Sequence, residues 1–428
     1  MDIIQELYQV FKSSSGISTD SRKDVRNTLF FALSGENFNG NRFAEIALNK
    51  GAKLAVIDDA SYKKDDRYLL VNNTLETLQQ LARYHRKQVN IPVIGITGTN
   101  GKTTTKELVA AVLKTTFNTV ATQGNYNNHI GVPLTLLRIG SKTEIAVIEM
   151  GANHPGEIRF LCNMALPTHG IVTNIGKAHL EGFGNFEGVK NTKKELYDFL
   201  NKNKGSVFVN AQDPLLLNLT EKLNRIATYG ADKSDVKGEI VNRKPFLKLK
   251  INFGETDVII SSQMYGSYNF SNIMAAAAVG SYFNVSPFYI AKAIENYRPS
   301  NNRSQQITTS KNHIVLDAYN ANPVSMATAI NSFVDAEFEN GCLILGDMFE
   351  LGLESEKEHQ KIVDLLLETD IQCVYLVGEG FAKTSNPFTG FLTTKEAFEF
   401  FKQNPLKGKN ILIKGSRGMH LETLLETL

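Results

Sequence analysis

The chain has 428 residues, of which 42% are hydrophobic and 21% are charged, and its formal net charge is +2. This length predicts two to four domains, each with its own core. The nearly balanced charge argues against a surface for nucleic acid. No apolar run approaches the roughly 18 residues that span a bilayer, so we expect no membrane insertion.

The cysteines and the first residues indicate where the chain resides. Cys162, Cys342 and Cys373 are scattered and form no CxxC pair, which predicts reduced thiols and no metal site built from cysteine. Residues 1–11 have helical spacing and lack a basic leader, so we expect no signal peptide. Both observations favour a cytoplasmic location.

The first block, residues 1–85, is predicted to be a small α/β domain. Short aliphatic and aromatic runs predict strands, and longer runs with helical spacing predict helices. The expected strands are residues 28–33, 54–57 and 68–71, and the expected helices are residues 43–50 and 75–87.

The second block, residues 86–300, alternates strands with helices, which is typical of a parallel sheet covered by helices. A buried strand over residues 91–97 is followed by a glycine-rich turn and a helix from residue 106. Residues 247–262 look instead like an antiparallel pair around Gly254. Further strands are expected at residues 145–149, 170–174 and 206–210, and further helices at residues 269–283 and 287–297.

The third block, residues 301–428, repeats the alternation after a polar boundary and predicts a smaller Rossmann-like domain. The fold class is therefore α/β with three domains: a small N-terminal domain, a central P-loop mononucleotide-binding domain with a parallel sheet, and a C-terminal Rossmann-like domain. Strands are expected at residues 313–317, 342–346, 373–377 and 410–414, with a helix at residues 354–368.

Residues 98–105, Gly-Thr-Asn-Gly-Lys-Thr-Thr-Thr, are the most informative motif, because they lie between a predicted strand and a predicted helix. Glycines let backbone N–H groups approach phosphates, and the helix N-terminus adds positive potential. Lys102 would reach the β- and γ-phosphates, and the Thr103 hydroxyl would help to hold Mg²⁺. Ile96 stands where the strict pattern has glycine, so the turn is a P-loop variant.

Two side chains near strand ends are candidate Mg²⁺ ligands, since ligands of open α/β sheets bind at the carboxyl ends of strands. Glu149 could hold the ion that bridges the nucleotide phosphates, or could face solvent. His179 could hold a second Mg²⁺, or be a hydrogen-bonded loop histidine. By pattern alone, Lys190, Lys193 and Lys194 indicate a solvated helix face.

Polar loops follow several strands and are candidate ligand contacts. Residues 125–129 offer donors and acceptors for a sugar or peptide, although a tight turn that uses Asn for local hydrogen bonds has the same pattern. Residues 317–323, 346–352 and 414–417 follow three strands of one predicted sheet, which suggests a site on that face. Any one of them alone could be a helix cap or a turn.

These motifs resemble, over nearly the whole chain, the Mur ligases, which are the ATP-dependent amide-forming enzymes of peptidoglycan precursor synthesis. The resemblance implies ATP and Mg²⁺ as cofactors, with Thr103, Glu149 and His179 on the metal. It also implies that Lys193 is carbamylated and becomes a further metal ligand, so that Lys102, His179 and Lys193 are the catalytic residues. The implied nucleotide contacts are Gly98, Thr99, Asn100, Gly101, Lys102, Thr103, Thr104, Asn272, Arg303 and Asp317.

Within the family, the motifs are similar to those of the branch that adds D-alanyl-D-alanine to UDP-N-acetylmuramoyl-tripeptide. These two small molecules are the implied partners, and the implied reaction passes through an acyl phosphate. Relatives that add diaminopimelate or lysine usually carry a different loop at residues 317–320. The implied substrate contacts are Asp20, Ser21, Arg22, Asn125, Asn127, Asn128, His129, Tyr319, Asn320 and Asn322.

The chain departs from the family pattern at two positions near the nucleotide. Tyr268 precedes Asn269 where the family commonly has His-Asn, and Asn302 precedes Arg303 where it has Gly-Arg. Two other functions stay open: a Mur-type or folylpolyglutamate-type ligase with a different acceptor, and a non-catalytic nucleotide-binding protein. We expect a monomer whose domains close over ATP.

Overall fold

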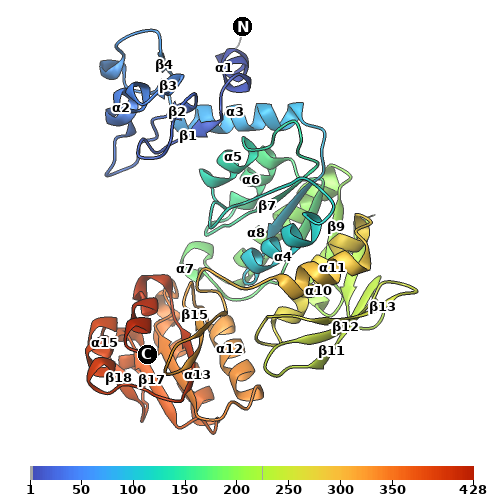
Figure 1. Cartoon of the computed structure of the whole chain (residues 1–428), viewed down its shortest axis with the longest axis vertical. Helices are drawn as coiled ribbons and strands as arrows, with labels where there is room; N and C mark the ends of the chain where they lie inside the picture. The colour runs from blue at the N-terminus through green and yellow to red at the C-terminus, as the bar shows by residue number, and fades with distance from the viewer. Residues whose placement is uncertain (1–2, 224) are drawn as a thin grey trace.

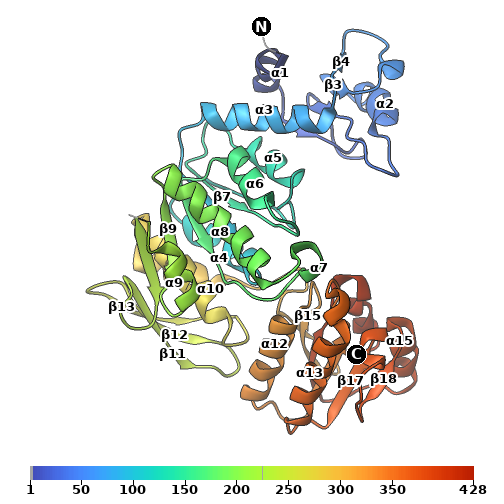
Figure 2. The ribbon, with the colours of Figure 1, turned by 180° about the vertical axis from the view of Figure 1, so that it is seen from behind.

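The computed structural model describes residues 3–223 and 225–428 and contains three sheets, one in each predicted block. The N-terminal domain lies at one end of the elongated molecule, the central domain in the middle and the C-terminal domain at the other end (Figures 1 and 2). The predicted α/β class with three domains is confirmed. Residues 1 and 2, where the first predicted helix was expected to begin, lie outside the described part.

The N-terminal sheet has four parallel strands in the order β1-β2-β3-β4. Helix α3 leaves this sheet for the central domain, and the Asn73 side chain caps it by accepting a hydrogen bond from the N–H of Glu76. Its apolar stripe packs into a core shared with the central domain. The elements are α1 (Ile3–Lys12), β1 (Ile17–Ser18), β2 (Leu29–Phe31), α2 (Ala44–Asn49), β3 (Leu54–Ile57), β4 (Tyr68–Leu70) and α3 (Thr74–Gln88).

The central sheet has nine strands in the order β13-β12-β11-β10-β9-β8-β5-β7-β6. The seven strands from β11 to β6 in this order are parallel to one another, and β12 and β13 form the predicted antiparallel pair. The sequence pattern did not predict β6, β10 and β11, because most of their side chains are partly exposed. The strands are β5 (Val93–Thr97), β6 (Thr119–Ala121), β7 (Ile145–Glu149), β8 (His169–Val172), β9 (Ser206–Asn210), β10 (Ile226–Gly230), β11 (Val236–Asn242), β12 (Lys248–Asn252) and β13 (Asp257–Ser261).

Helices cover both faces of this sheet. Successive side chains of a strand point to opposite faces, so Val93 of β5 lies in one core and Ile94 in the other. Helix α4 begins at Lys102 rather than at residue 106, because Gly101 adopts a left-handed conformation (φ 77°) that caps the helix there. The helices are α4 (Lys102–Leu113), α5 (Gly131–Leu136), α6 (Glu157–Ala165), α7 (Leu180–Phe183), α8 (Phe186–Lys202), α9 (Pro214–Thr220), α10 (Asn269–Tyr282) and α11 (Pro287–Asn296).

The C-terminal sheet has six strands in the order β14-β15-β19-β16-β17-β18, and only β14 runs antiparallel to its neighbour. The carboxyl ends of β15, β19 and β16 therefore lie side by side, which brings the three predicted polar loops to one edge. The elements are β14 (Gln305–Thr308), β15 (His313–Asp317), α12 (Pro323–Asp335), β16 (Gly341–Gly346), α13 (Ser355–Leu367), β17 (Cys373–Val377), α14 (Glu379–Ala382), β18 (Thr389–Phe391), α15 (Thr394–Gln403) and β19 (Asn410–Lys414).

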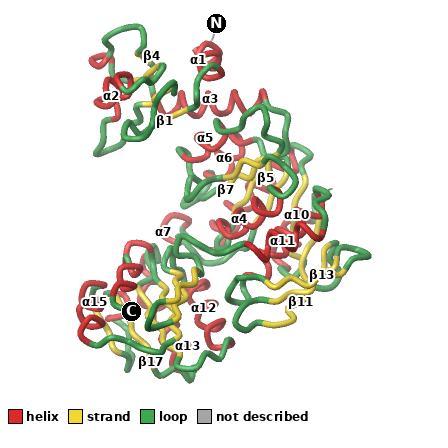
Figure 3. Tube along the Cα trace, in the orientation of Figure 1, coloured by secondary structure: helices red, strands yellow, loops and turns green. Residues whose placement is uncertain are grey.

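Loops make up much of the region between the central and C-terminal sheets (Figure 3). The domain boundaries after residues 85 and 300 stay predictions; α3 continues to Gln88, and β14 begins at Gln305. Among the described residues, no helix is both long and apolar enough to cross a membrane.

Candidate active site

A cleft of about 670 Å³ lies between the central and C-terminal domains. The loops that follow β5, β7, β8 and β15 line it, as expected where the carboxyl ends of parallel strands meet. The predicted site residues that line the cleft are Thr99, Asn100, Gly101, Lys102, Thr103, Thr104, Asn125, Asn127, Asn128, His129, Glu149, His179, Asn272, Arg303, Asp317, Tyr319, Asn320 and Asn322.

Two glycines shape the phosphate loop by adopting backbone conformations that other residues rarely adopt. Gly98 has φ 143° and Gly101 has φ 77°. A Cβ on Gly98 would lie 2.0 Å from Oγ1 of Thr173, and a Cβ on Gly101 would lie 2.6 Å from Oδ1 of Asn272. The loop is therefore packed directly against the end of β8 and the first turn of α10, with no room for a side chain at either position.

Lys102 lies in the first turn of α4, and its ammonium group folds back over the loop. Its Nζ donates hydrogen bonds to the carbonyl oxygens of Gly98 and Thr99, each at 2.8 Å. Burial lowers the pKa of Lys102 to about 8, although the Glu149 carboxylate opposes this shift. A phosphate group in the cleft would give this ammonium a charged partner in place of two neutral carbonyls.

The Glu149 carboxylate, at the end of β7, does not face solvent and is only 1% exposed. Its Oε1 accepts hydrogen bonds from Oγ1 of Thr103 at 3.1 Å and from Nδ2 of Asn127 at 2.8 Å. Its Oε2 lies 3.6 Å from Nζ of Lys106 and accepts no hydrogen bond from the residues that the structure describes. A buried carboxylate with a free oxygen beside a threonine hydroxyl suits Mg²⁺, which prefers oxygen ligands.

Lys193 of α8 does not lie on a solvated helix face, contrary to the pattern of its lysine cluster. It is 2% exposed, and its Nζ lies 5.3 Å from the centroid of the Phe183 ring. Burial, reinforced by the nearby charge of Lys102, lowers the pKa of Lys193 to about 7. Lys190 and Lys194 do form surface ion pairs with acidic residues of the same helix.

His179 lines the cleft and is held mostly away from solvent. Burial lowers its pKa, against the opposing charge of Glu350, which favours the neutral imidazole that ligates metals. Within the described ranges, no group of three His, Cys, Asp or Glu side chains could hold a metal ion. A second Mg²⁺ near His179 would thus require an additional anionic ligand, and a carbamate on Lys193 would be one.

The polar loop before α5 combines a site residue with turn residues. Asn127 contacts Glu149, whereas the side chain of Asn128 accepts a hydrogen bond from the N–H of Gly131 at 2.9 Å and so supports the turn. The exposed His129 lines the cleft. The local turn is therefore confirmed at Asn128, whereas contact of this loop with a ligand stays a prediction.

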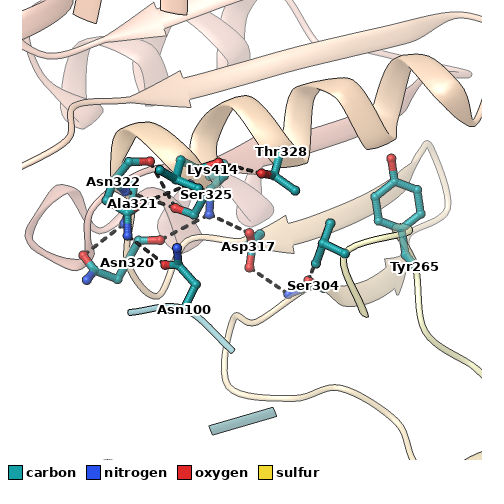
Figure 4. A network of polar contacts seen from close by, with 12 residues as sticks. Asn100, Tyr265, Ser304, Asp317, Asn320, Ala321, Asn322, Ser325, Thr328 and Lys414 are labelled. Carbon is teal, nitrogen blue, oxygen red and sulfur yellow. Dashed lines mark hydrogen bonds and ion pairs between the residues drawn. The ribbon is translucent and has the colours of Figure 1, made fainter. Parts of the chain in front are cut away.

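The C-terminal domain contributes a hydrogen-bonded network at the ends of β15 and β19 (Figure 4). Lys414 is 2% exposed, and its Nζ donates to Oδ2 of Asp317 at 2.6 Å and to the carbonyl oxygen of Asn320 at 3.2 Å. Oδ1 of Asp317 accepts a hydrogen bond from the N–H of Ser304 at 3.0 Å. These contacts fix the Asp317 carboxylate in one orientation at the cleft.

One hydrogen bond joins this network to the phosphate loop. Nδ2 of Asn322 donates to Oδ1 of Asn100 at 2.7 Å (Figure 4). Asn322 also caps α12 by accepting a hydrogen bond from the N–H of Ser325. The C-terminal domain is therefore already in contact with the phosphate loop in this structure.

The two departures from the family pattern involve the segment around Arg303: Asn302 precedes it, and Tyr268 contacts Ser304, which follows it. The guanidinium carbon of Arg303 lies 3.5 Å from the centroid of the Tyr319 ring, a cation–π contact. Asn302 has φ 57°, a left-handed conformation that asparagine tolerates better than most other residues, which explains why it can replace glycine. The hydroxyl of Tyr268 forms a hydrogen bond with that of Ser304 at 2.7 Å.

Asp20, Ser21 and Arg22 lie in the N-terminal domain and do not line the cleft. Arg22 forms two hydrogen bonds of 2.9 Å with Asp20, and its side chain is 88% exposed. Figures 1 and 2 show the central domain between this domain and the C-terminal one. The structure thus leaves these three residues apart from the rest of the predicted site.

Two buried lysines contact carboxylates of the site but were not predicted as individual site residues, Lys106 and Lys414. Lys106 follows Lys102 by four residues, so the helical repeat places both on one face of α4, and this spacing could have identified it. Lys414 lies at the end of β19, where a polar loop was noted. Its partner depends on the strand order, which the sequence did not reveal.

Comparison with known proteins agrees with this geometry. Residues 96–280 match the Mur ligase middle domain, residues 302–417 match the Mur ligase glutamate ligase domain, and residues 13–94 match the Mur ligase family catalytic domain. The chain therefore belongs to the Mur ligase family, as its motifs indicated.

Within this family, the chain is similar to one kind of enzyme in particular. It is 35% identical to the UDP-N-acetylmuramoyl-tripeptide--D-alanyl-D-alanine ligase of Bacillus subtilis (strain 168), with 96% of this chain and 93% of that protein covered. MurF from Acinetobacter baumannii has a similar structure, with 30% identity, a TM-score of 0.84 and coverage of 99% and 97%. MurF ligase from Thermotoga maritima, solved in complex with ADP, has 25% identity, a TM-score of 0.85 and coverage of 98% and 97%.

Proposed function

We propose that the chain is an ATP-dependent, ADP-forming ligase that joins D-alanyl-D-alanine to UDP-N-acetylmuramoyl-tripeptide, giving the pentapeptide precursor of peptidoglycan. The observation that carries this proposal is that the phosphate loop, the Thr103–Glu149 pair and the polar loops of the C-terminal domain meet in one cleft. Identity over nearly the full length to a ligase of that name supports the two substrates.

ATP would place its phosphates on the loop before α4, where backbone N–H groups and Lys102 can hold them. Thr103 and Glu149 would hold Mg²⁺, which when bound neutralises charge on the β- and γ-phosphates. The complex of a related ligase with ADP supports the proposed nucleotide binding, and the buried Glu149 oxygen without a hydrogen bond supports the proposed metal binding. Gly98, Thr99, Asn100, Gly101, Thr104, Asn272, Arg303 and Asp317 are the further nucleotide contacts that we propose.

The terminal carboxylate of the tripeptide would attack the γ-phosphorus, which forms an acyl phosphate and releases ADP. The amine of D-alanyl-D-alanine would then attack the acyl carbon, lose a proton and expel inorganic phosphate. Lys102 would stabilise the charge on the transferred phosphoryl group, because it is positioned before the reaction begins. Contact between the two domains would keep water from the acyl phosphate.

Lys193 is proposed to be carbamylated and, with His179, to hold a second Mg²⁺. A lysine with a pKa of about 7 is largely neutral at slightly alkaline pH, and the neutral amine is the form that adds CO₂ and loses a proton. The product is an anion, which would remove the repulsion between Lys193 and Lys102. Among the described residues, the lack of a ready-made metal cluster near His179 is consistent with this need for an added anion.

The substrates would contact polar side chains on both walls of the cleft. The central domain offers the loop before α5, and the C-terminal domain offers the loop between β15 and α12. The uridine diphosphate end of the longer substrate would reach the N-terminal domain. The proposed contacts are Asn125, Asn127, Asn128, His129, Tyr319, Asn320 and Asn322 in the cleft, and Asp20, Ser21 and Arg22 in the N-terminal domain.

The test is ADP release that depends on both substrates. The protein should release ADP only when UDP-N-acetylmuramoyl-tripeptide and D-alanyl-D-alanine are both present, and Lys102→Ala should abolish this release. Lys190→Ala, which removes a surface ion pair with Glu187, is the matched control and should keep it. If the unmodified protein releases no ADP in this assay, the substrate assignment is wrong.

The same assay addresses the two alternatives and the remaining expectations. A panel of other acceptors, including glutamate with a folate, would reveal a different ligase, and no turnover with any acceptor would favour a non-catalytic nucleotide-binding protein. The monomeric state and the cytoplasmic location stay predictions, which sedimentation and cell fractionation would check.

A further inference from the structure

The loop after β16 reaches across the domain boundary to His179. Oε2 of Glu350, in this loop, lies against Nδ1 of His179 in an ion-pair contact. Apart from this contact, Nδ1 is buried and has no hydrogen-bond partner among the described residues, whereas the Glu350 side chain is 53% exposed. Helix α7, which directly follows His179, lies beside the C-terminal domain in both views (Figures 1 and 2).

The C-terminal domain holds this loop rigidly by its first residue. The carboxylate of Asp347 accepts hydrogen bonds from the N–H of Gly380 at 2.8 Å and from the N–H of Phe381 at 3.0 Å. A Cβ on Gly380 would lie 2.9 Å from Oδ1 of Asp347, so the backbone at Gly380 is packed closely against the carboxylate. The base of the loop is therefore fixed to the start of α14.

The next two residues of the loop are held as well. The N–H of Met348 donates to Nε2 of His359 at 3.0 Å, and the N–H of Phe349 donates to Oγ of Ser416 at 2.9 Å. Three consecutive residues are thus anchored to three different elements of the C-terminal domain. The C-terminal domain therefore fixes the position from which the side chain of the next residue, Glu350, projects.

The backbone at the contact is strained on both sides. His179 has φ 50° and Glu350 has φ 62°, in the left-handed region that is uncommon for residues other than glycine, and more so for glutamate than for histidine. Such conformations persist where the surrounding structure imposes them, commonly at functional sites. The fold imposes this conformation on both members of the pair.

We propose that Glu350 is the positioning residue of His179, and that it orients the imidazole for the second Mg²⁺ when the C-terminal domain is closed. The inference rests on the proposed function. A proton on Nδ1, facing the Glu350 carboxylate, would leave only Nε2 as a metal ligand. Histidines that bind metals generally donate their other ring N–H to a carboxylate, which fixes the tautomer and the ring orientation. Here the carboxylate comes from another domain, so metal binding and domain closure are linked.

A second ion pair between the domains provides the control. Nζ of Lys177 lies 3.7 Å from Oε1 of Glu358, on α13. This pair joins the same two domains but touches neither His179 nor Glu350. Lys177→Gln therefore weakens the contact between the domains without altering the imidazole. Comparing it with Glu350→Ala distinguishes loss of ring orientation from loss of contact between the domains.

The test is Mn²⁺ binding to the full chain with saturating ADP and bicarbonate, measured by electron paramagnetic resonance of free Mn²⁺. His179→Ala identifies the class of sites that needs the imidazole. Glu350→Ala should weaken this class about 10-fold or more, because loss of such outer partners typically costs 10–100-fold in metal affinity. Glu350→Gln, which keeps an acceptor oxygen, should have a smaller effect, and the other class should not change.

Two results would overturn the inference. One is unchanged Mn²⁺ binding by Glu350→Ala, and the other is an equal loss in Lys177→Gln, which would make both pairs simple attachments between domains. A wild-type chain without any class that depends on His179 would remove the metal site and this role of Glu350 together. The binding measurement needs no turnover, so ADP release measured in parallel reports on the ligase function separately.

Discussion

Replacing Lys193 with Met should stabilise the protein near neutral pH while it removes ligase activity. Lys193 is 2% exposed, and burial and the charge of Lys102 lower its pKa to about 7. Methionine keeps a long unbranched side chain and lacks the amine, so it removes the unfavourable group with little change in volume. Stability and function therefore make opposite demands on this position.

The pKa gives the size and the sign of the effect. In the unfolded chain a lysine titrates near 10.5, and each unit of difference corresponds to about 1.4 kcal/mol. The amine should therefore destabilise the fold by about 5 kcal/mol well below pH 7, and by about 4 kcal/mol at about pH 7.5. Because the folded pKa is the lower one, wild-type stability rises with pH between about 7 and 10.5, and the advantage of methionine disappears there.

The assay is urea unfolding at about pH 6, 7.5 and 9 in CO₂-free buffer. The control is Lys194→Met, since Lys194 is 36% exposed and paired with Asp198, and such surface pairs contribute about 0–1 kcal/mol. Bicarbonate should stabilise the wild type alone, because only Lys193 can form the carbamate. The reasoning is refuted if Lys193→Met is the less stable protein, or if its advantage is the same at all three pH values.

Three further outcomes are expected. Lys193→Ala should lose activity and regain part of it with a short-chain carboxylate such as acetate; full activity without acetate would remove Lys193 from the mechanism. Gly101→Ala should bind ATP about 10-fold more weakly in calorimetry, because the left-handed backbone alone costs about 1–2 kcal/mol and Asn272 must move. Asn302→Val should destabilise the fold by about 1–3 kcal/mol in urea unfolding, whereas Asn302→Gly should be nearly neutral; equal effects would contradict the backbone argument.

Much of the fold could be predicted from local patterns. Hydrophobic runs of the right length placed β7 and β9 at their observed bounds. Short or partly exposed strands such as β6 and β11 were not predicted. They pair at the outer part of the sheet, where burial no longer imposes an apolar pattern on the sequence. The sequence pattern predicted the start of α4 at residue 106 instead of Lys102, because the observed cap depends on the left-handed conformation of Gly101.

The sequence by itself determined the chemistry of the phosphate loop, because its function depends on residues that are neighbours in the chain. Glycine conformations, the lysine and the following threonine act within one turn of α4, so spacing alone identifies them. The same is true of Glu149 as a candidate, since its position at a strand end can be recognised locally. The family followed from several such local motifs together.

Only the tertiary structure decided which side chains meet across the domains and which are buried. Lys193 looked like part of a solvated face, and its low pKa arises from packing against α7 and from the charge of Lys102, which is 91 positions earlier in the chain. The contact of Glu350 with His179 likewise depends on how the central and C-terminal domains are placed relative to each other. Desolvation and Coulomb interactions depend on distance in space, which local sequence patterns do not encode.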